Sequence, residues 1–281
     1  MALESLSLRT NLFSINSQRN LSRTERVFGT TMGRLSSGMR IMKASDDAAG
    51  LSISEKLRAQ LRGFLQAQRN ANDGISLLQV AEGALGEIGD MLIRQRELAV
   101  QSANGTLGSD ERASLNDEFV ALRSEIDRIA DGTEFNGIQL IDGTFSAGID
   151  FQVGIQNNPG VDRINVRLTE SHATSLGITG GMSLSTVTGS QAAIGLLDSA
   201  IQTVANQRGD IGAVQNRFIT TVNNIRTMHE NLSAARSRIA DADVAEESAA
   251  FARTQILMQA GLSVLSQANQ LPSMALSLIQ G

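Results

Sequence analysis

The 281-residue sequence contains no cysteine, which excludes disulfide bonds, zinc–thiolate sites and catalysis by a thiol. It also contains no tryptophan and no tyrosine, and its nine phenylalanines make up the whole aromatic content of 3%. Few large aromatic side chains are therefore available to fill a compact globular core. The composition favours long helices that pack against one another.

Long apolar runs are also missing. No run approaches the ~18 residues that a membrane-spanning helix needs, so no membrane span is expected. The opening residues Met1 to Glu4 lack the basic flank and the apolar block of a secretory signal peptide. We therefore expect a protein that is either cytoplasmic or exported without a cleaved signal peptide.

Motifs for catalysis are absent as well. The two histidines, His172 and His229, do not form the His-Glu-x-x-His spacing of a metalloprotease. The sequence has neither a Gly-x-x-x-x-Gly-Lys phosphate-binding loop nor a Gly-x-Ser-x-Gly nucleophile elbow. Asp46 and Asp47 are adjacent, but no histidine or third acid lies near them, so helix capping suits them better than metal binding. The sequence predicts no enzyme activity, no cofactor and no metal.

Positive charge is concentrated at the amino-terminal end of a chain whose net charge is −5. Residues 1–70 carry 11 basic and five acidic side chains, which would suit nucleic acid or an acidic membrane. No basic run exceeds two residues, and no tyrosine or tryptophan is present for base stacking. We interpret these charges as the solvated faces of helices, with a nucleic-acid-binding coiled coil as the alternative.

A heptad repeat organises residues 194–239. An apolar residue recurs at every seventh position, and a mixed row lies three residues before it, which predicts a helix supercoiled with partner helices in a left-handed sense. We expect the mixed row to set the register of packing. The apolar seam is Leu197, Val204, Ile211, Phe218, Ile225, Leu232 and Ile239, and the mixed row is Ile194, Ile201, Arg208, Gln215, Val222, His229 and Arg236.

Apolar spacing predicts further helices over residues 3–42, 57–99 and 110–130, and another after Asp241. Ahead of the helix at 57–99, Ser45 can cap a new helix start, and Ser52 with Glu55 is a further capping-box candidate. Glycines at positions 83, 86 and 89 would permit a close approach of another backbone. The last helix is apolar on more than one side and has no counterpart in a single chain except the amino-terminal helix, and such surfaces usually mark association sites. We expect the apolar faces of residues 3–42 and 242–281 to stay unburied until neighbouring copies supply partners.

In the middle of the chain, the spacing of apolar residues changes from a helical period to alternation. Apolar residues alternate over 149–155 and 164–168 on either side of a turn-forming segment, which predicts a β-hairpin near 149–168. Residues 169–193 are rich in serine, threonine and glycine. We interpret them as an exposed link and as a candidate carrier of O-linked glycans.

Short segments near both ends of the chain form a set that resembles bacterial flagellin, the filament subunit. The resemblance covers nearly the whole chain. The matching segments are Leu35-Ser-Ser-Gly-Met-Arg-Ile41, Asp46-Asp-Ala-Ala-Gly-Leu51, Arg96-Glu-Leu-Ala-Val-Gln-Ser-Ala-Asn104, Glu125-Ile-Asp-Arg128, Phe135-Asn-Gly137, Gly212-Ala-Val-Gln-Asn-Arg-Phe218, Ser233-Ala-Ala-Arg-Ser-Arg-Ile239-Ala-Asp241 and Gln267-Ala-Asn-Gln270.

Together with the helical patterns, the resemblance implies a mainly α fold, an antiparallel long-helix coiled-coil bundle with a small β-hairpin region. Residues 1–43 and 242–281 would be inner-tube helices, and residues 44–168 and 194–241 would form the two halves of a core rod domain. The link at 169–193 leaves no room for the large variable outer domains of many flagellins. The resemblance is therefore to a short flagellin.

The same resemblance implies partners and a location. The chain would polymerise with itself into the extracellular flagellar filament that propels swimming. It would leave the cell largely unfolded through the flagellum's own channel, aided by an export chaperone and the export apparatus. Assembly would take place beneath the filament cap, and hook-associated proteins would be further partners.

The resemblance also implies recognition by a vertebrate host. In flagellins that the toll-like flagellin receptor senses, an arginine, a leucine and a glutamate on adjacent helices form the contact. The matching positions here are Arg94, Leu98 and Glu118. The alternative is that Leu98 is a packing residue and that Arg94 and Glu118 form a surface ion pair worth about 0–1 kcal/mol.

Two other classes compete with the filament subunit. The hook–filament junction protein shares flagellin-like ends, but the motif at 267–270 and the match over 196–241 favour flagellin. Some flagellins carry an inserted metalloprotease, and the absence of its histidine spacing argues against that class.

Overall fold

The computed structural model describes residues 10–280, and side chains as far as Gln270. The chain divides into two compact units, one formed by Met1–Ala59 with Leu232–Gly281 and the other by Gln60–Asn231, here called unit 1 and unit 2. The elements are α1 (Leu12–Ser37), α2 (Ala48–Ser102), α3 (Ser109–Gly132), β1 (Glu134–Phe135), β2 (Ile138–Gln139), β3 (Ile149–Gln152), α4 (Pro159–Asp162), β4 (Arg163–Val166), α5 (Val187–Ala240) and α6 (Val244–Gln280). This confirms the predicted mainly α fold.

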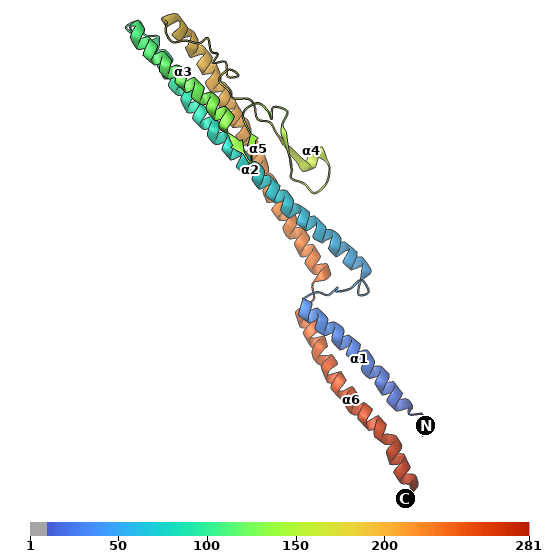
Figure 1. Cartoon of the computed structure of the whole chain (residues 1–281). Helices are drawn as coiled ribbons and strands as arrows, with labels where there is room; N and C mark the ends of the chain where they lie inside the picture. Colours follow the sequence, from blue (N-terminus) through green and yellow to red (C-terminus); the bar gives the residue numbers. More distant parts are fainter. Residues whose placement is uncertain (1–9, 281) are drawn as a thin grey trace. The chain divides into compact units, whose positions relative to one another are not determined.

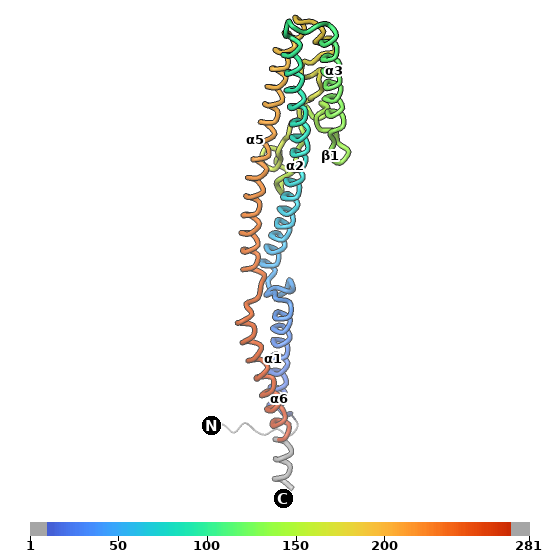
Figure 2. The backbone as a smooth tube through the Cα atoms, turned by 90° about the vertical axis from the view of Figure 1, so that its left-hand side faces the viewer, coloured from blue at the N-terminus to red at the C-terminus, as the bar shows by residue number. Residues whose placement is uncertain are grey.

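Unit 2 is built on α2, α3 and α5, which lie side by side in both views (Figures 1 and 2). Gly74 of α2 lies against Phe218 of α5, and Gly89 lies against Val204. The two helices therefore run antiparallel, as predicted. Their shared core is continued by buried residues of α3, including Phe119 and Ile126.

The heptad seam faces this core over the part of α5 that belongs to unit 2. Five seam residues are buried there, from Leu197 to Ile225. In the second row, Ala193 and Ala200 are more deeply buried than Ile194 and Ile201, which are half-buried and pack against the same core. Arg208 is exposed. Small alanines allow a closer approach of helices than isoleucine would, and the row returns to its predicted position at Val222, which is buried.

Two hairpins follow α3. The first, β1–β2, turns through Asn136 and Gly137, which both have positive φ angles (53° and 76°), as a two-residue type I′ turn requires. The second pairs β3 with β4 in antiparallel register from Ile149↔Val166 to Gln152↔Arg163. It confirms the hairpin predicted near 149–168, with the short helix α4 in its connection.

Residues 169–193 differ from the exposed link that was predicted. Ala173, Ile178 and Leu184 are completely buried in the unit 2 core, and α5 already begins at Val187. The backbone amide of Leu184 donates to Asn116 Oδ1 (2.9 Å). The serine- and threonine-rich composition concealed widely spaced apolar residues that attach this segment to the helices.

Unit 1 contains α1 and α6. Asn11 caps α1, since its Oδ1 accepts from the Ser14 amide (3.0 Å), and Gly38 ends the helix with a φ of +70°, the left-handed conformation common at helix ends. The helix predicted over 3–42 is therefore shorter within the described residues, and residues 3–9 lie outside them. After α1, the chain pairs with the α5–α6 connection through Arg40 N–H to Ala240 O (2.8 Å).

The second helix begins nine residues before its predicted start. Asp47, rather than Ser45, caps it by accepting from the Gly50 amide (2.8 Å). A side chain at Gly50 would collide with the Asp47 carboxylate and lie 2.7 Å from Ile41 Cδ1. Asp46 accepts from the amides of Lys43 and Met42, and these bonds lower the pKa of its carboxyl group. The Asp-Asp-Ala-Ala-Gly segment is thus a compact helix start.

Candidate assembly interface

The helices α1 and α6 of unit 1 pair along a seam (Figures 1 and 2). Burial recurs on each helix at alternating steps of three and four residues, the spacing of an antiparallel coiled coil. On α1 the positions include Ser14, Ser17, Leu21, Thr24, Phe28, Thr31 and Leu35, and on α6 they include Glu247, Phe251, Thr254, Met258, Gly261, Leu265 and Ala268.

Polar contacts hold the two ends of this seam. Arg34 Nη1 lies 3.0 Å from Glu247 Oε1 in a largely shielded ion pair. At the other end, Ser14 Oγ donates to Asn269 Oδ1 (2.8 Å), and Asn11 Nδ2 donates to Ala268 O (2.7 Å). The terminal helices were predicted to leave their apolar faces unburied in a single chain. That prediction was wrong for this face, because the two helices cover each other.

Other large apolar side chains of the same two helices are exposed, on more than one side of each helix. Leu12 and Ile256, for example, are 62% and 66% exposed. Exposed apolar residues that cluster on one element mark association sites more often than isolated ones do. Among the side chains described as far as Gln270, the large apolar residues exposed on α1 and α6 are Leu12, Phe13, Ile15, Val27, Met32, Val244, Ile256, Leu257, Leu262 and Val264.

The carboxy-terminal end of the α5 seam belongs to unit 1. Leu232 and Ile239 are half-buried there. Arg40 Nη2 donates to Ile239 O (2.7 Å), so the end of α5 is tied to the segment that follows α1. These two seam positions are less enclosed than those in unit 2.

The residues predicted for receptor contact lie on α2 and α3 of unit 2. Arg94 lies 2.8 Å from Glu118 and 3.0 Å from Glu97. The hydrogen bond that Arg94 donates to Glu118 is the main cause of a raised pKa of the Arg94 guanidinium. Leu98, by contrast, is completely buried. The structure thus brings the charged pair together at the surface and places the leucine in the core beneath it.

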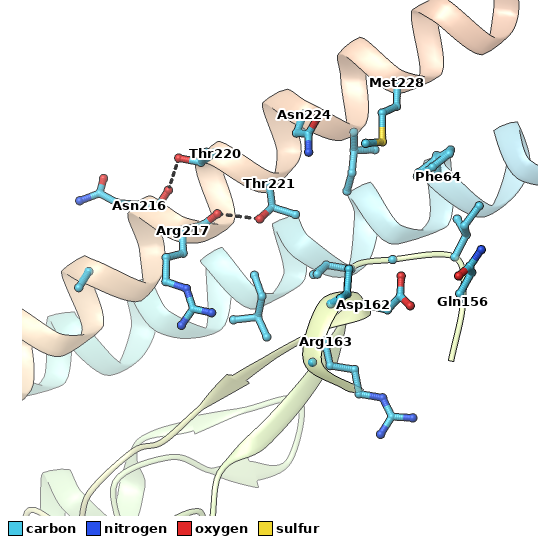
Figure 3. Close-up of a pocket in the computed structure, with 18 residues that line it drawn as sticks. Phe64, Gln156, Asp162, Arg163, Asn216, Arg217, Thr220, Thr221, Asn224 and Met228 are labelled. Atoms are coloured by element: carbon cyan, nitrogen blue, oxygen red, sulfur yellow. Dashed lines mark hydrogen bonds between the residues drawn. The ribbon is translucent and has the colours of Figure 1, made fainter. Parts of the chain in front are cut away.

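A groove of about 690 Å³ lies between α2, α5 and the β3–α4–β4 segment (Figure 3). Thr220 and Thr221 line it, but their hydroxyls donate to carbonyls of their own helix. Asp162 accepts from the Asn158 amide (3.0 Å). These three polar side chains are therefore occupied by local structure.

Some important contacts were not anticipated by any sequence pattern. Arg112 is buried and donates to the carbonyl oxygens of Ser102, Asn104 (3.1 Å) and Leu107 (2.8 Å), which closes the end of α2. Close helix approach occurs at Gly74 rather than at positions 83 and 86, where nothing lies within 4 Å of the place that a Cβ atom would take.

Chemistry of other kinds is not supported by the described residues. No cluster of three or more histidine, cysteine, aspartate or glutamate side chains in them could hold a metal ion. None of their helices is both long and apolar enough to cross a membrane. Long paired helices that carry exposed apolar side chains are typical of a helical structural protein.

Comparison with known proteins supports this class. Residues 8–146 match the bacterial flagellin N-terminal helical region, and residues 194–279 match the C-terminal helical region. The chain is 45% identical over 272 residues to flagellin of Halalkalibacterium halodurans, covering 96% of this chain and 98% of that one. It is 38% identical over 306 residues to flagellin of Bacillus subtilis, covering 98% and 100%.

The chain belongs to the bacterial flagellin family. It is a structural subunit of the flagellar filament outside the cell, not an enzyme. A putative flagellar hook-associated protein from Vibrio parahaemolyticus has a similar fold, with a TM-score of 0.59, 16% identity, and coverage of 70% of this chain and 100% of that one. At that identity the similarity concerns the fold alone and does not favour the hook-associated alternative.

Proposed function

We propose that the chain polymerises when neighbouring copies cover the exposed apolar side chains of α1 and α6. The exposure of these side chains is the observation that carries the proposal. Full burial of a large apolar side chain contributes about 1.5–3 kcal/mol. These partly exposed side chains therefore leave a substantial driving force for association between copies.

The pairing of α1 with α6 supports a stepwise assembly. Much of their seam consists of serine, threonine, glycine and alanine, which bury little apolar surface. The pair alone is therefore weakly stabilised, and contacts with neighbouring copies add to its stability by mass action. A weakly stabilised pair also suits a chain that is exported largely unfolded with an export chaperone and the export apparatus.

The filament cap and hook-associated proteins are further partners under this proposal. The cap would hold arriving subunits while their terminal helices find neighbours. The hook–filament junction protein remains the alternative role for this chain. The two roles predict different behaviour, because a filament subunit adds to its own polymer without limit and a junction protein does not.

Seeded growth tests the proposal. Short filament fragments are mixed with purified full-length monomer, and filament length is followed by electron microscopy. We expect the fragments to lengthen in proportion to the monomer added. Monomer that stays unassociated in the presence of seeds would contradict the proposal, and growth that stops after a few subunits would favour the junction role.

The chain is also proposed to engage the vertebrate toll-like flagellin receptor through Arg94 and Glu118. The exposed position of this ion pair supports such a contact, whereas Leu98 would contribute by packing beneath it. A reporter-cell assay should show a lower response for Glu118→Ala, with thermal unfolding measured as a check on folding. Undiminished signalling by Glu118→Ala would contradict direct recognition of this pair.

For Leu98→Ala we expect a loss of stability of about 2–5 kcal/mol, because the side chain is fully buried. Any loss of signalling in that variant should therefore accompany a lower unfolding temperature. Loss of signalling without a change in stability would instead assign Leu98 a direct contact.

A further inference from the structure

His172 of unit 2 lies between two carboxylates. Its Nε2 is 2.9 Å from Asp131 Oδ1 in the last turn of α3, and its Nδ1 is 3.1 Å from Glu170 Oε1. A neutral imidazole has one N–H group and can donate only one hydrogen bond. Both contacts are satisfied as hydrogen bonds to ionised carboxylates only when the ring carries two protons.

The other charged groups near this ring are also acidic. Asp142 lies in the loop after β2. Hydrogen bonds from Thr144 are the main cause of the lowered pKa of its carboxyl group, and the charge of His172 adds to this effect. Asp127 Oδ1 of α3 accepts a hydrogen bond from the backbone amide of Ala173, the residue that follows His172 (2.9 Å). The contact from the α5 side is neutral, since Ser171 Oγ donates to Gln207 Oε1 (3.1 Å).

The negative charges of Asp131 and Glu170 are not neutralised by a bound lysine or arginine within the described residues. Arg128, the last basic residue of α3, is engaged with Glu125. Within the described residues, no lysine or arginine is recorded in a hydrogen bond or ion pair with Asp131 or Glu170. The end of α3 also presents its carbonyl groups, which favour a positive charge nearby. The surroundings therefore favour the protonated ring.

The His172 ring adds a polar contact to residues 169–178, which are otherwise held to unit 2 mainly by buried apolar side chains. The Ser171 amide donates to Ile141 O (2.9 Å), and Ala173, Leu176 and Ile178 are buried in the core. His172 is the ionisable side chain of this short segment that bonds directly to α3. Its protonation state is thus coupled to the attachment of residues 169–178.

We propose that His172 is a pH-sensitive clamp, which fastens residues 169–178 to the end of α3 when its ring is doubly protonated and loosens them when it loses a proton. On deprotonation, one ring nitrogen would present a lone pair to a carboxylate oxygen at hydrogen-bonding distance. That contact changes from attractive to repulsive. The proposal concerns a single chain and does not depend on polymerisation.

The direction of the effect follows from linkage. The hydrogen bond with Asp131 is the main cause that raises the pKa of His172 above its ordinary value, while burial opposes it. A raised pKa in the folded state stabilises the clamp fully below the pKa of the unfolded chain, about 6.5. This stabilisation is lost as the pH rises through the folded-state pKa.

Two measurements on the full-length chain test the clamp. In an NMR titration, we expect the midpoint of His172 to lie above its value in the denaturant-unfolded chain. In hydrogen exchange corrected for the intrinsic rate, we expect protection of residues 171–178 to fall between mildly acidic and alkaline pH. The fall should be about tenfold for each unit by which the pKa is raised.

Variants separate the clamp from general stability. His172→Gln should lose the pH dependence of protection, while His229→Gln should keep it. Asp131→Asn should lower the titration midpoint of His172 and reduce the pH dependence without removing the ring. The proposal is overturned if His172 titrates at or below its unfolded-chain value, or if His172→Gln retains the wild-type pH dependence.

Discussion

Phe28 of α1 stacks against Phe251 of α6, with ring centroids 4.9 Å apart and ring planes inclined by 28°. This contact joins the two helices between the Ser14–Asn269 hydrogen bond and the Arg34–Glu247 ion pair. Aromatic pairs add about 0.5–1.5 kcal/mol to the contribution of their buried area. Because the surrounding seam is formed mainly by small side chains, the two rings are its principal apolar anchor.

Phe28→Ala should weaken the α1–α6 pair by about 2 kcal/mol, less than the ~3–5 kcal/mol of a fully buried phenylalanine because the ring is half-buried. Hydrogen exchange of α1 and α6 in the monomer measures this effect. Phe13→Ala is a matched control, since Phe13 lies on the same helix and is 59% exposed. Equal losses of protection in the two variants would contradict the pairing described above.

Replacing Gly74 by alanine should destabilise the protein, although replacing a glycine by alanine usually stabilises a helix. Alanine normally stabilises a helix interior by about 1 kcal/mol relative to glycine. At Gly74, however, a Cβ atom would lie 2.8 Å from Phe218 Cζ and 3.2 Å from Phe151 Cδ1. We expect Gly74→Ala to lower the free energy of unfolding by about 1–3 kcal/mol, measured by urea denaturation.

Gly83→Ala on the same helix provides the control. Gly83 has nothing within 4 Å of the position of a Cβ atom, so this substitution should raise the stability of the monomer by up to about 1 kcal/mol. Stabilisation of similar size by both substitutions would show that α2 and α5 do not approach closely at Gly74.

The Arg112 side chain should contribute strongly to the stability of unit 2. The residue is only 7% exposed, and its guanidinium binds three backbone carbonyls at and beyond the end of α2. Arg112→Ala should cost about 2–4 kcal/mol, because buried carbonyl groups lose their donors. Arg112→Lys should recover only part of this loss, since an ammonium lacks the planar fork.

An exposed arginine on α5, Arg226, serves as the comparison. Arg226→Ala should change the unfolding free energy by no more than about 0.5 kcal/mol. Urea denaturation of the three variants under one set of conditions compares them directly. A loss at Arg112→Ala as small as that at Arg226→Ala would contradict its role at the end of α2.

The sequence predicted the long helices and the β3–β4 hairpin because each has a sustained hydrophobic period. The α5 pattern placed Leu197 and Phe218 on one face, and both are buried. Asn136 and Gly137 form a dipeptide that favours a turn, but the two-residue strands on either side of it are too short to show a hydrophobic period. Short elements depend on their tertiary surroundings and leave little trace in the pattern.

Other features could not be predicted because they depend on how two distant segments of the chain pack, and not on the pattern within one segment. The amino-terminal helix was named as the one counterpart of the last helix. The α1–α6 seam uses serine and threonine at positions where a core is expected to be apolar, however, so its burial within a single chain was not predicted. The apolar residues of 169–193 are too widely spaced to show periodicity, although Ile178 and Leu184 are completely buried. Leu98 was predicted as a receptor contact by resemblance, and its burial depends on the packing of α3 against α2.

Seeded filament growth by a double variant, Ile256→Gln with Leu257→Gln, tests the central claim that exposed apolar side chains of α6 drive association. Both side chains are more than half exposed in the single chain, so the unfolding temperature of the monomer should not change. We expect the critical concentration for growth to rise by about tenfold or more, since each lost apolar contact is worth on the order of 1 kcal/mol. The matched control is Gln255→Ala with Ser263→Ala, two exposed polar positions on the same helix. Growth of the Ile256→Gln, Leu257→Gln variant at the wild-type critical concentration would contradict the account.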